Sequence, residues 1–181
     1  MRCEQCAETI PVKAGRVPRY CSGACRQKAY RARAGQRVTS PFPQEMRSAD
    51  RWVRADGKRP IMADGRPASS TNPRTWAPFE GVAQGAGDGM GFMLGDGFAC
   101  LDLDHCIDDR GRLSHLAQSI VAQNPGAFIE KSMSGHGLHV FGRLPARRGR
   151  KLAGLEVYSQ ARFIRTTGDV VQQGSLETLK W

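Results

Sequence analysis

Two aspartates end an apolar stretch near the middle of the chain, Phe98-Ala99-Cys100-Leu101-Asp102-Leu103-Asp104. Alternate side chains of a β-strand share a face, so Asp102 and Asp104 point one way and the leucines the other. The two carboxylates then lie roughly 7 Å apart, a span that suits one or two divalent metal ions. Acids at the end of an apolar strand repel each other and lose solvation, which a cation would relieve. The simpler interpretation is an exposed strand end that leads into an acidic turn.

Two later segments supply further charged candidates. Glu156 alternates with apolar neighbours in Leu155-Glu156-Val157-Tyr158 and could complete a three-carboxylate metal site, or could be a surface strand residue. Arg162 and Arg165 follow a few residues later. Either guanidinium could bind a phosphate, and the alternative is that both are solvated strand arginines.

A turn rich in serine and glycine lies between two apolar segments. Ser132, Ser134, Gly135 and Gly137 form a short polar turn that could direct backbone N–H groups and hydroxyls at an anion. His139 follows in an apolar strand, where it could donate to a phosphate oxygen. A structural histidine beside an ordinary hairpin turn is the alternative.

Four cysteines near the N-terminus have the spacing of metal ligands. Cys3 and Cys6 form one pair, Cys21 and Cys25 form a second, and 14 residues separate the two pairs. Tetrahedral zinc takes four thiolates from two such short loops, and a segment this small has too little apolar surface to fold unaided. The alternative is four reduced thiols in a disordered tail. Cys100 and Cys106 are expected to pack in the core.

The net charge of +10 is concentrated in the first third of the chain. Residues 1–59 hold 14 basic and 5 acidic residues, whereas residues 60–181 hold 13 and 12. This asymmetry favours a polyanionic partner, nucleic acid first, over a merely solvated basic face. Much of the charge lies on an expected helix that starts after Ser22 as N-cap and stops at Gly35.

The elements that must position these residues indicate an α+β fold with a mixed, mostly antiparallel sheet. Residues 1–37 are expected to form the zinc-binding module, 38–46 a linker with two prolines, and 47–181 the second domain. Expected helices cover residues 45–54 and 114–123. Expected strands cover 92–94 and 98–104, then 127–131 and 138–141 around the Ser/Gly turn, then 155–158 and 162–166 as a hairpin.

The N-terminus has no apolar segment typical of a signal peptide, and no run of about 18 apolar residues occurs. The sequence therefore predicts an intracellular, cytoplasmic protein.

Taken in order, these motifs resemble the bifunctional primase/polymerase domain of the archaeo-eukaryotic primase superfamily, common in phages and plasmids. The resemblance runs from about Arg47 to Gly168. It includes Asp-x-Asp-x-Cys, then Ser-x-Ser-Gly-x-Gly-x-His, then apolar-Glu-x-Tyr and Arg-Phe-x-x-x-Thr-Gly. Trp52, the segment 57–60 and Asn72-Pro73-Arg74-Thr75-Trp76 agree with it upstream. The first 33 residues separately resemble small four-cysteine modules of phage and actinobacterial proteins.

The resemblance implies a mechanism and a set of residues. Asp102, Asp104 and Glu156 would bind two catalytic Mg²⁺ or Mn²⁺ ions, and His139 would contact the triphosphate of the incoming nucleotide. Ser132, Ser134, Gly135 and Gly137 would shape the nucleotide pocket, and Arg162 would help hold the phosphates. Zn²⁺ would be structural. Glutamate stands at the third acidic position, where many relatives carry aspartate.

The resemblance also implies partners: a single-stranded DNA template and nucleoside triphosphates. The basic zinc module would grip the template through Arg26, Lys28, Arg31 and Arg33, with Tyr30 stacking on a base. Because the chain ends at Trp181, a helicase or helical accessory domain is expected to be a separate partner.

Two other functions stay open. One is a catalytically inactive single-stranded DNA-binding module. The other is a metal-dependent nuclease or a relaxase. The spacing of His136 and His139 disfavours the relaxase, because residues three apart cannot share a strand face.

Overall fold

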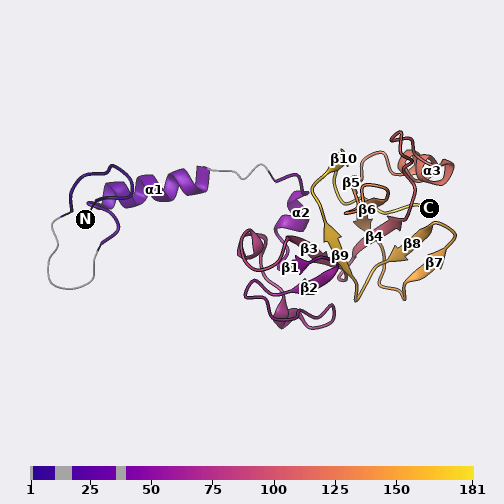
Figure 1. Ribbon diagram of the computed structural model, residues 1–181, viewed down its shortest axis with the longest axis horizontal. Helices are drawn as coiled ribbons and strands as arrows, with labels where there is room; N and C mark the ends of the chain where they lie inside the picture. The colour runs from indigo at the N-terminus through magenta and orange to yellow at the C-terminus, as the bar shows by residue number, and fades with distance from the viewer. Residues whose placement is uncertain (1, 11–17, 36–39) are drawn as a thin grey trace. The chain divides into compact units, whose positions relative to one another are not determined.

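The computed structural model describes residues 2–10, 18–35 and 40–181, with backbone alone for 30–35 (Figure 1). The chain divides into two compact units, Met1–Ser40 and Pro41–Trp181. In the described part of the chain, no helix has the length and apolar character needed to cross a membrane.

In the first unit, the described residues form one helix, α1 (Gly23–Gly35), next to the cysteine loops. It begins where the sequence predicts, because Ser22 Oγ accepts a hydrogen bond from the backbone N–H of Cys25 at 3.2 Å. Arg26 and Lys28, two of the residues predicted to contact nucleic acid, lie in this helix, and both side chains are exposed. The side chains of Tyr30, Arg31 and Arg33 lie outside the described residues.

The second unit contains two sheets, and the described strands pair antiparallel throughout. The four-stranded sheet has the order β2-β1-β3-β9, from β1 (Trp52–Asp56), β2 (Arg59–Ile61), β3 (Gly89–Met93) and β9 (Phe163–Thr166). The six-stranded sheet has the order β10-β5-β6-β4-β8-β7, from β4 (Phe98–Leu103), β5 (Phe128–Lys131), β6 (Leu138–Arg143), β7 (Arg150–Leu152), β8 (Leu155–Tyr158) and β10 (Val170–Gln172). Short helices complete the unit: α2 (Gln44–Arg47), α3 (His115–Gln123), η1 (Pro73–Thr75) and η2 (Phe79–Val82). The predicted α+β class with mostly antiparallel sheets is confirmed.

The six-stranded sheet buries both of its faces. Leu101 and Leu103 of β4 lie on the face that packs against Ala117 and Ile120 of α3. On the other face, Cys100, Phe128 and Phe141 pack with aromatic and aliphatic side chains of the four-stranded sheet, among them Trp52, Phe92 and Ile164. The side chains between the sheets thus form an aromatic core, and any open site on this face must lie at the edge of that core.

The predicted helix over residues 45–54 is wrong in its second half. The helix ends at Arg47, and Trp52 and Val53 belong to strand β1. Trp52 is fully buried, and its indole N–H donates to the carbonyl of Met46 at 2.8 Å. Pairing with β3 therefore overrides the local helical pattern. Phe42 and Met46 are also buried, so residues 41–46 of the expected linker pack in the second unit.

The predicted hairpin of residues 155–158 and 162–166 is also wrong. Strand β8 pairs with β4 and β7 in the larger sheet, whereas β9 pairs with β3 in the smaller sheet. The chain therefore crosses between the sheets at residues 159–162, where Ala161 takes a positive φ of 50°. This crossing, which sequence alone does not reveal, carries Arg162 to the boundary between the two sheets.

Candidate active site

Four neighbouring strands bring polar side chains together in one line across the six-stranded sheet. In the strand register, Glu156 of β8 lies opposite Asp102 of β4, Asp102 lies opposite His139 of β6, and His139 lies opposite Glu130 of β5. Directly paired residues of antiparallel strands share a face of the sheet. We call these four residues the polar row. Three of them are predicted site residues, and the fourth, Glu130, was not among the predicted residues.

The polar row runs from the interior of the unit toward solvent. The side chain of Glu130 is 0% exposed and that of His139 is 8% exposed, against 16% for Asp102 and 17% for Glu156. Burial raises the pKa of Asp102 above its ordinary value; His139 opposes this rise, and Asp104 and Glu156 add to it. A partly buried group of carboxylates is therefore crowded with negative charge.

Glu130 holds His139 in place from the buried end of the polar row. Its Oε1 lies 3.1 Å from His139 Nδ1, and its Oε2 accepts hydrogen bonds from the backbone N–H groups of Thr167 and Gly168 at 3.1 and 2.9 Å. A carboxylate only accepts, so Nδ1 carries the proton, and Nε2 lies on the side of Asp102, 3.8 Å from Oδ1. A glutamate within the otherwise apolar strand sequence Phe128-Ile129-Glu130 was the available signal for this role.

Glu156 is surrounded by groups that stabilise its charge. Lys151 of β7 forms an ion pair with Oε1, the Tyr158 hydroxyl donates to Oε2, and an Arg162 nitrogen lies 3.9 Å from Oε2. The hydrogen bond from Lys151, followed by that from Tyr158, lowers the pKa of Glu156. Burial and the same hydrogen bond to Glu156 raise the pKa of Tyr158 to about 12. Both groups therefore keep their charge state at neutral pH.

The Ser/Gly turn between β5 and β6 is closed by its own hydrogen bonds. Ser132 Oγ accepts from the Gly137 N–H at 3.1 Å, and Ser134 Oγ accepts from the His136 N–H at 3.3 Å. Gly135 has a φ of +77°, and a Cβ on Gly137 would lie 2.7 Å from the Leu103 carbonyl oxygen. The two glycines therefore fix the shape of the turn, while the serine side chains line the neighbouring pocket.

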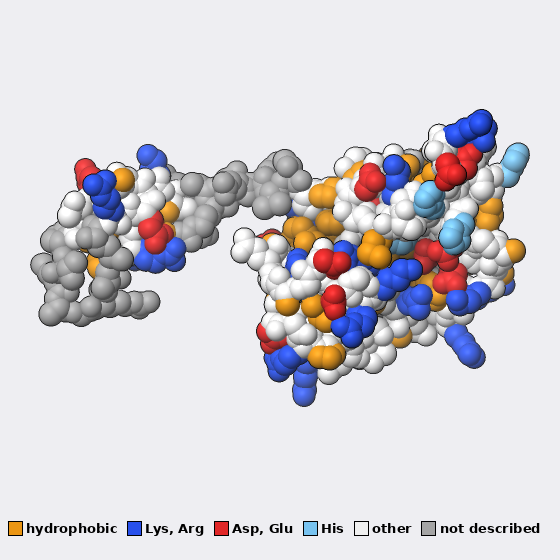
Figure 2. Space-filling view, in the orientation of Figure 1, with side chains coloured by type: hydrophobic (Ala, Val, Ile, Leu, Met, Phe, Trp, Pro, Cys, Tyr) orange, Lys and Arg blue, Asp and Glu red, His pale blue; other side chains and the backbone are white. Residues whose placement is uncertain are grey.

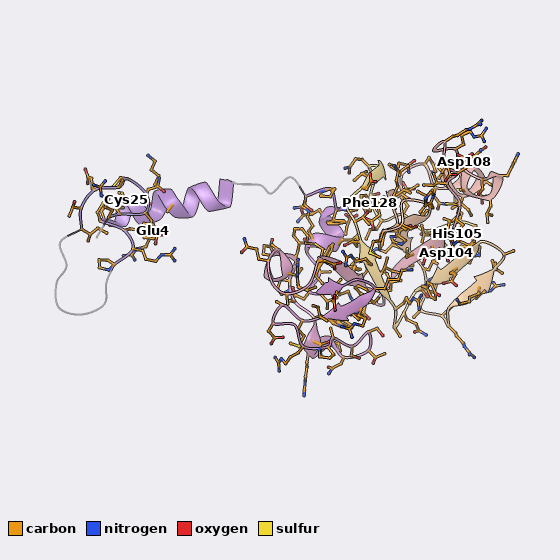
Figure 3. The ribbon with its side chains drawn as sticks, viewed as in Figure 1. Glu4, Cys25, Asp104, His105, Asp108 and Phe128 are labelled. Carbon is orange, nitrogen blue, oxygen red and sulfur yellow. The ribbon has the colours of Figure 1, made fainter. Side chains whose placement is uncertain are left out.

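A pocket of about 520 Å³ opens over the polar row, between the two sheets of the second unit. Figure 2 shows acidic side chains gathered beside histidines on this unit, with Lys and Arg side chains around them. Asp104 and His105 follow the end of β4, as labelled in Figure 3. Seven of the predicted site residues line the pocket: Asp102, Asp104, Ser132, Ser134, His139, Glu156 and Arg162. Gly135 and Gly137 are outside this lining.

The pocket also has two further basic residues: Lys58, which was not a predicted site residue, and Arg165, which the sequence offered beside Arg162 as a phosphate-binding candidate. Lys58 follows β1 and Arg165 lies on β9, so both come from the four-stranded sheet and line the pocket. Arg165 donates to the Gly57 carbonyl and to Asp88 Oδ1, each at 2.8 Å. Carboxylates thus lie on the large sheet, and cationic groups lie opposite on the small one.

The carboxylates have the chemistry of a magnesium or manganese site, since both ions prefer oxygen ligands. Three carboxylates line one pocket, those of Asp102, Asp104 and Glu156. The partial burial of Asp102 and the negative charges of Asp104 and Glu156 all raise the pKa of Asp102. Among the described residues, however, these carboxylates do not bring three ligand atoms as close together as the cysteines do. Instead, one oxygen of Glu156 is ion-paired with Lys151.

The four predicted cysteines do converge. Their sulfur atoms all lie within 4.8 Å of one another, with Cys6 to Cys21, Cys21 to Cys25 and Cys25 to Cys6 at 3.6, 3.4 and 3.7 Å. Tetrahedral bonds of about 2.3 Å from zinc to sulfur put the sulfur atoms about 3.8 Å apart, so the cluster fits one such ion. Burial opposes ionisation of Cys3, but backbone N–H donors, that of Cys21 first, lower its pKa to about 6.

Comparison with known proteins supports the predicted resemblance. No family model matches the chain. The chain is 33% identical over 120 residues to a protein of Nitratiruptor phage NrS-1 named "DNA Primase-polymerase". The match covers 59% of this chain and 17% of the phage protein, so the chain spans less than a fifth of that relative. The chain is therefore similar in sequence to part of a phage protein named DNA primase-polymerase.

Proposed function

We propose that this chain is a nucleotidyltransferase that copies single-stranded DNA, by primer synthesis, DNA polymerisation or both, in phage or plasmid-type replication. The observation that carries the proposal is the pocket itself. Two carboxylates of the polar row, Asp102 and Glu156, and their neighbour Asp104 line one cavity together with hydroxyl, imidazole and guanidinium groups. Oxygen ligands for divalent cations thus lie beside donors for a polyphosphate.

The reaction is the attack of a 3′-hydroxyl on the α-phosphate of a nucleoside triphosphate, with pyrophosphate as the leaving group. Asp102, Asp104 and Glu156 would hold Mg²⁺ or Mn²⁺, which when bound supplies charge stabilisation to the attacking and leaving oxygens. His139 presents Nε2 to the pocket because Glu130 occupies Nδ1. His139, Ser132, Ser134 and Arg162 bind and orient the triphosphate, and the turn built on Gly135 and Gly137 places the serines.

The first unit serves as a structural zinc module that contacts the template. Cys3, Cys6, Cys21 and Cys25 hold Zn²⁺, and the exposed Arg26 and Lys28 contact phosphates. Tyr30, Arg31 and Arg33 complete this surface. The protein acts in the cytoplasm, together with a helicase or a helical accessory domain.

The test is incorporation of labelled nucleotides on a single-stranded template with Mg²⁺ or Mn²⁺, with and without a primer. The wild type is compared with D102N/D104N and with the control D50N/D109N, which removes two exposed carboxylates elsewhere on the same unit. We expect the wild type and the control to synthesise, and D102N/D104N to lose synthesis while it remains folded, with a melting temperature no lower than that of the wild type.

The other outcomes favour different functions. Synthesis by a folded D102N/D104N variant would overturn the metal assignment. Binding of the template without any synthesis by the wild type would favour an inactive DNA-binding module, and metal-dependent shortening of the labelled template would favour a nuclease.

A further inference from the structure

A short basic segment forms one edge of the six-stranded sheet, next to the polar row. Arg147, Arg148, Arg150 and Lys151 lie within five residues, and all four are exposed. We call them the basic arm. No acidic residue occurs from 144 to 155, and Lys151 is ion-paired with Glu156, the next acidic residue along the chain. The sequence did not predict these residues as DNA-binding, because the part of the chain around them is almost neutral overall.

The basic arm is fixed beside the pocket by contacts with β8. The Arg147 N–H donates to Ser159 Oγ at 2.9 Å, and the Ser159 hydroxyl donates back to the Arg147 carbonyl at 3.3 Å. A Cβ on Gly149 would lie 2.7 Å from the Tyr158 ring, so the backbone there rests directly on that ring. Strand β7 then pairs with β8, with Lys151 opposite Glu156. The arm is therefore anchored rather than free, and it adjoins the polar row.

Lys151 connects the basic arm to the candidate metal ligands. Its side chain is 74% exposed, whereas that of its ion-pair partner Glu156 is 17% exposed. The lysine thus reaches in from solvent toward a carboxylate of the pocket. It can leave at little cost, because an exposed lysine ion pair contributes little stability. A divalent cation on Glu156 and the Lys151 ammonium compete for the same carboxylate oxygens.

We propose that the basic arm binds the phosphate backbone of single-stranded DNA, and that Lys151 moves from Glu156 to a phosphate when the strand binds. Glu156 is then released to ligate the metal ion, so strand and metal each strengthen binding of the other. A single phosphate engages one or two of these cations, whereas a polynucleotide offers repeated charges to all four. The inference rests on the proposed function for the identity of the strand and the metal.

The first test measures strand binding without synthesis. Labelled oligo(dT) is titrated with the full chain at several salt concentrations, using wild type, R148A/R150A and the control R66A/R110A. The control removes two exposed arginines from loops outside the basic arm in the same unit. Loss of two phosphate contacts weakens binding roughly tenfold and lowers the salt slope by about 1.4. Equal binding by R148A/R150A and R66A/R110A would overturn the role of the arm.

The second test measures the competition for Glu156. Mn²⁺ binding is followed by electron paramagnetic resonance for wild type and K151M, with and without oligo(dT), after subtraction of an oligonucleotide blank. K151M should bind Mn²⁺ more tightly than wild type in the absence of DNA, and oligo(dT) should add less to it. Unchanged Mn²⁺ affinity in K151M would overturn the competition.

The two proposals can fail separately, because neither test uses nucleotide incorporation. If the wild type makes no product but R148A/R150A loses strand binding, the proposed nucleotidyltransferase function is refuted and the DNA-binding role of the basic arm is supported. If the wild type synthesises while R148A/R150A binds DNA like its control, the DNA-binding role of the basic arm is refuted and the proposed nucleotidyltransferase function is supported.

Discussion

Glu130 and His139 form a buried pair across β5 and β6, with Glu130 Oε1 3.1 Å from His139 Nδ1. The remaining oxygen of Glu130 is taken by two backbone N–H groups that follow β9. Since β9 belongs to the four-stranded sheet, this carboxylate links both sheets and the histidine. The imidazole that lines the pocket is therefore oriented by a residue that lies behind it, out of reach of solvent.

We expect E130Q to change the tautomer of His139. The amide oxygen would accept from Thr167 and Gly168, its NH₂ group would face Nδ1, and the ring proton would move to Nε2. By comparison with carboxylates that orient metal-bound histidines, nucleotide incorporation should fall roughly 10- to 100-fold. Side-chain ¹⁵N spectra of labelled histidine report the tautomer directly. An unchanged tautomer in a folded E130Q variant, with the exposed E80Q as control, would refute the positioning role.

We expect D102N to stabilise the protein at neutral pH while abolishing synthesis. Burial raises the pKa of Asp102 in the folded state above its ordinary value of 3.8, so its ionised form opposes folding. This penalty is complete above the raised pKa, shrinks as pH falls between the two values, and vanishes below about 3.8. Thermal melting of wild type and D102N from pH 3 to pH 8 measures it. A difference in melting temperature that grew toward low pH would contradict the assignment.

We expect C21S to lose zinc without changing the melting of the second unit. Cys21 has two sulfur neighbours, at 3.6 and 3.4 Å, and the four-sulfur cluster lies in the first unit. Metal content is measured on purified wild type, C21S and the control C106A, whose cysteine is buried in the second unit. Wild type and C106A should carry about one zinc per chain. Equal zinc in C21S and wild type would refute the four-cysteine site.

We expect G137A to destabilise the second unit more than G135A. A Cβ at position 137 would lie 2.7 Å from a backbone oxygen of Leu103, and overpacking of this kind costs about 1–3 kcal/mol. Position 135 has open space, so G135A costs about 1 kcal/mol from its positive φ alone. Chemical denaturation of the two variants compares these costs. A smaller loss in G137A would mean that β4 and the turn do not approach this closely.

Local patterns were sufficient for the parts of the site that depend on near neighbours in sequence. Alternation along β4 placed Leu101 and Leu103 in the core with α3 and left Asp102 on the other face. The same holds for three features that depend on residues within one segment: the paired cysteines, the helix capped by Ser114, and the turn from Ser132 to Gly137. For these, spacing and the geometry of a strand, cap or turn carry the information.

Tertiary structure decided which segments lie side by side. The sequence by itself determined that carboxylates, a histidine and a polar turn occur in a definite order on strands. It could not determine that β8 and β9 separate into two sheets, that Trp52 ends up in a strand, or that Lys151 faces Glu156. Glu130 was missed for the same reason, because its partners His139, Thr167 and Gly168 are 9 to 38 residues away. Strand pairing joins residues that are distant along the chain, and its register depends on burial of whole faces rather than on any local pattern.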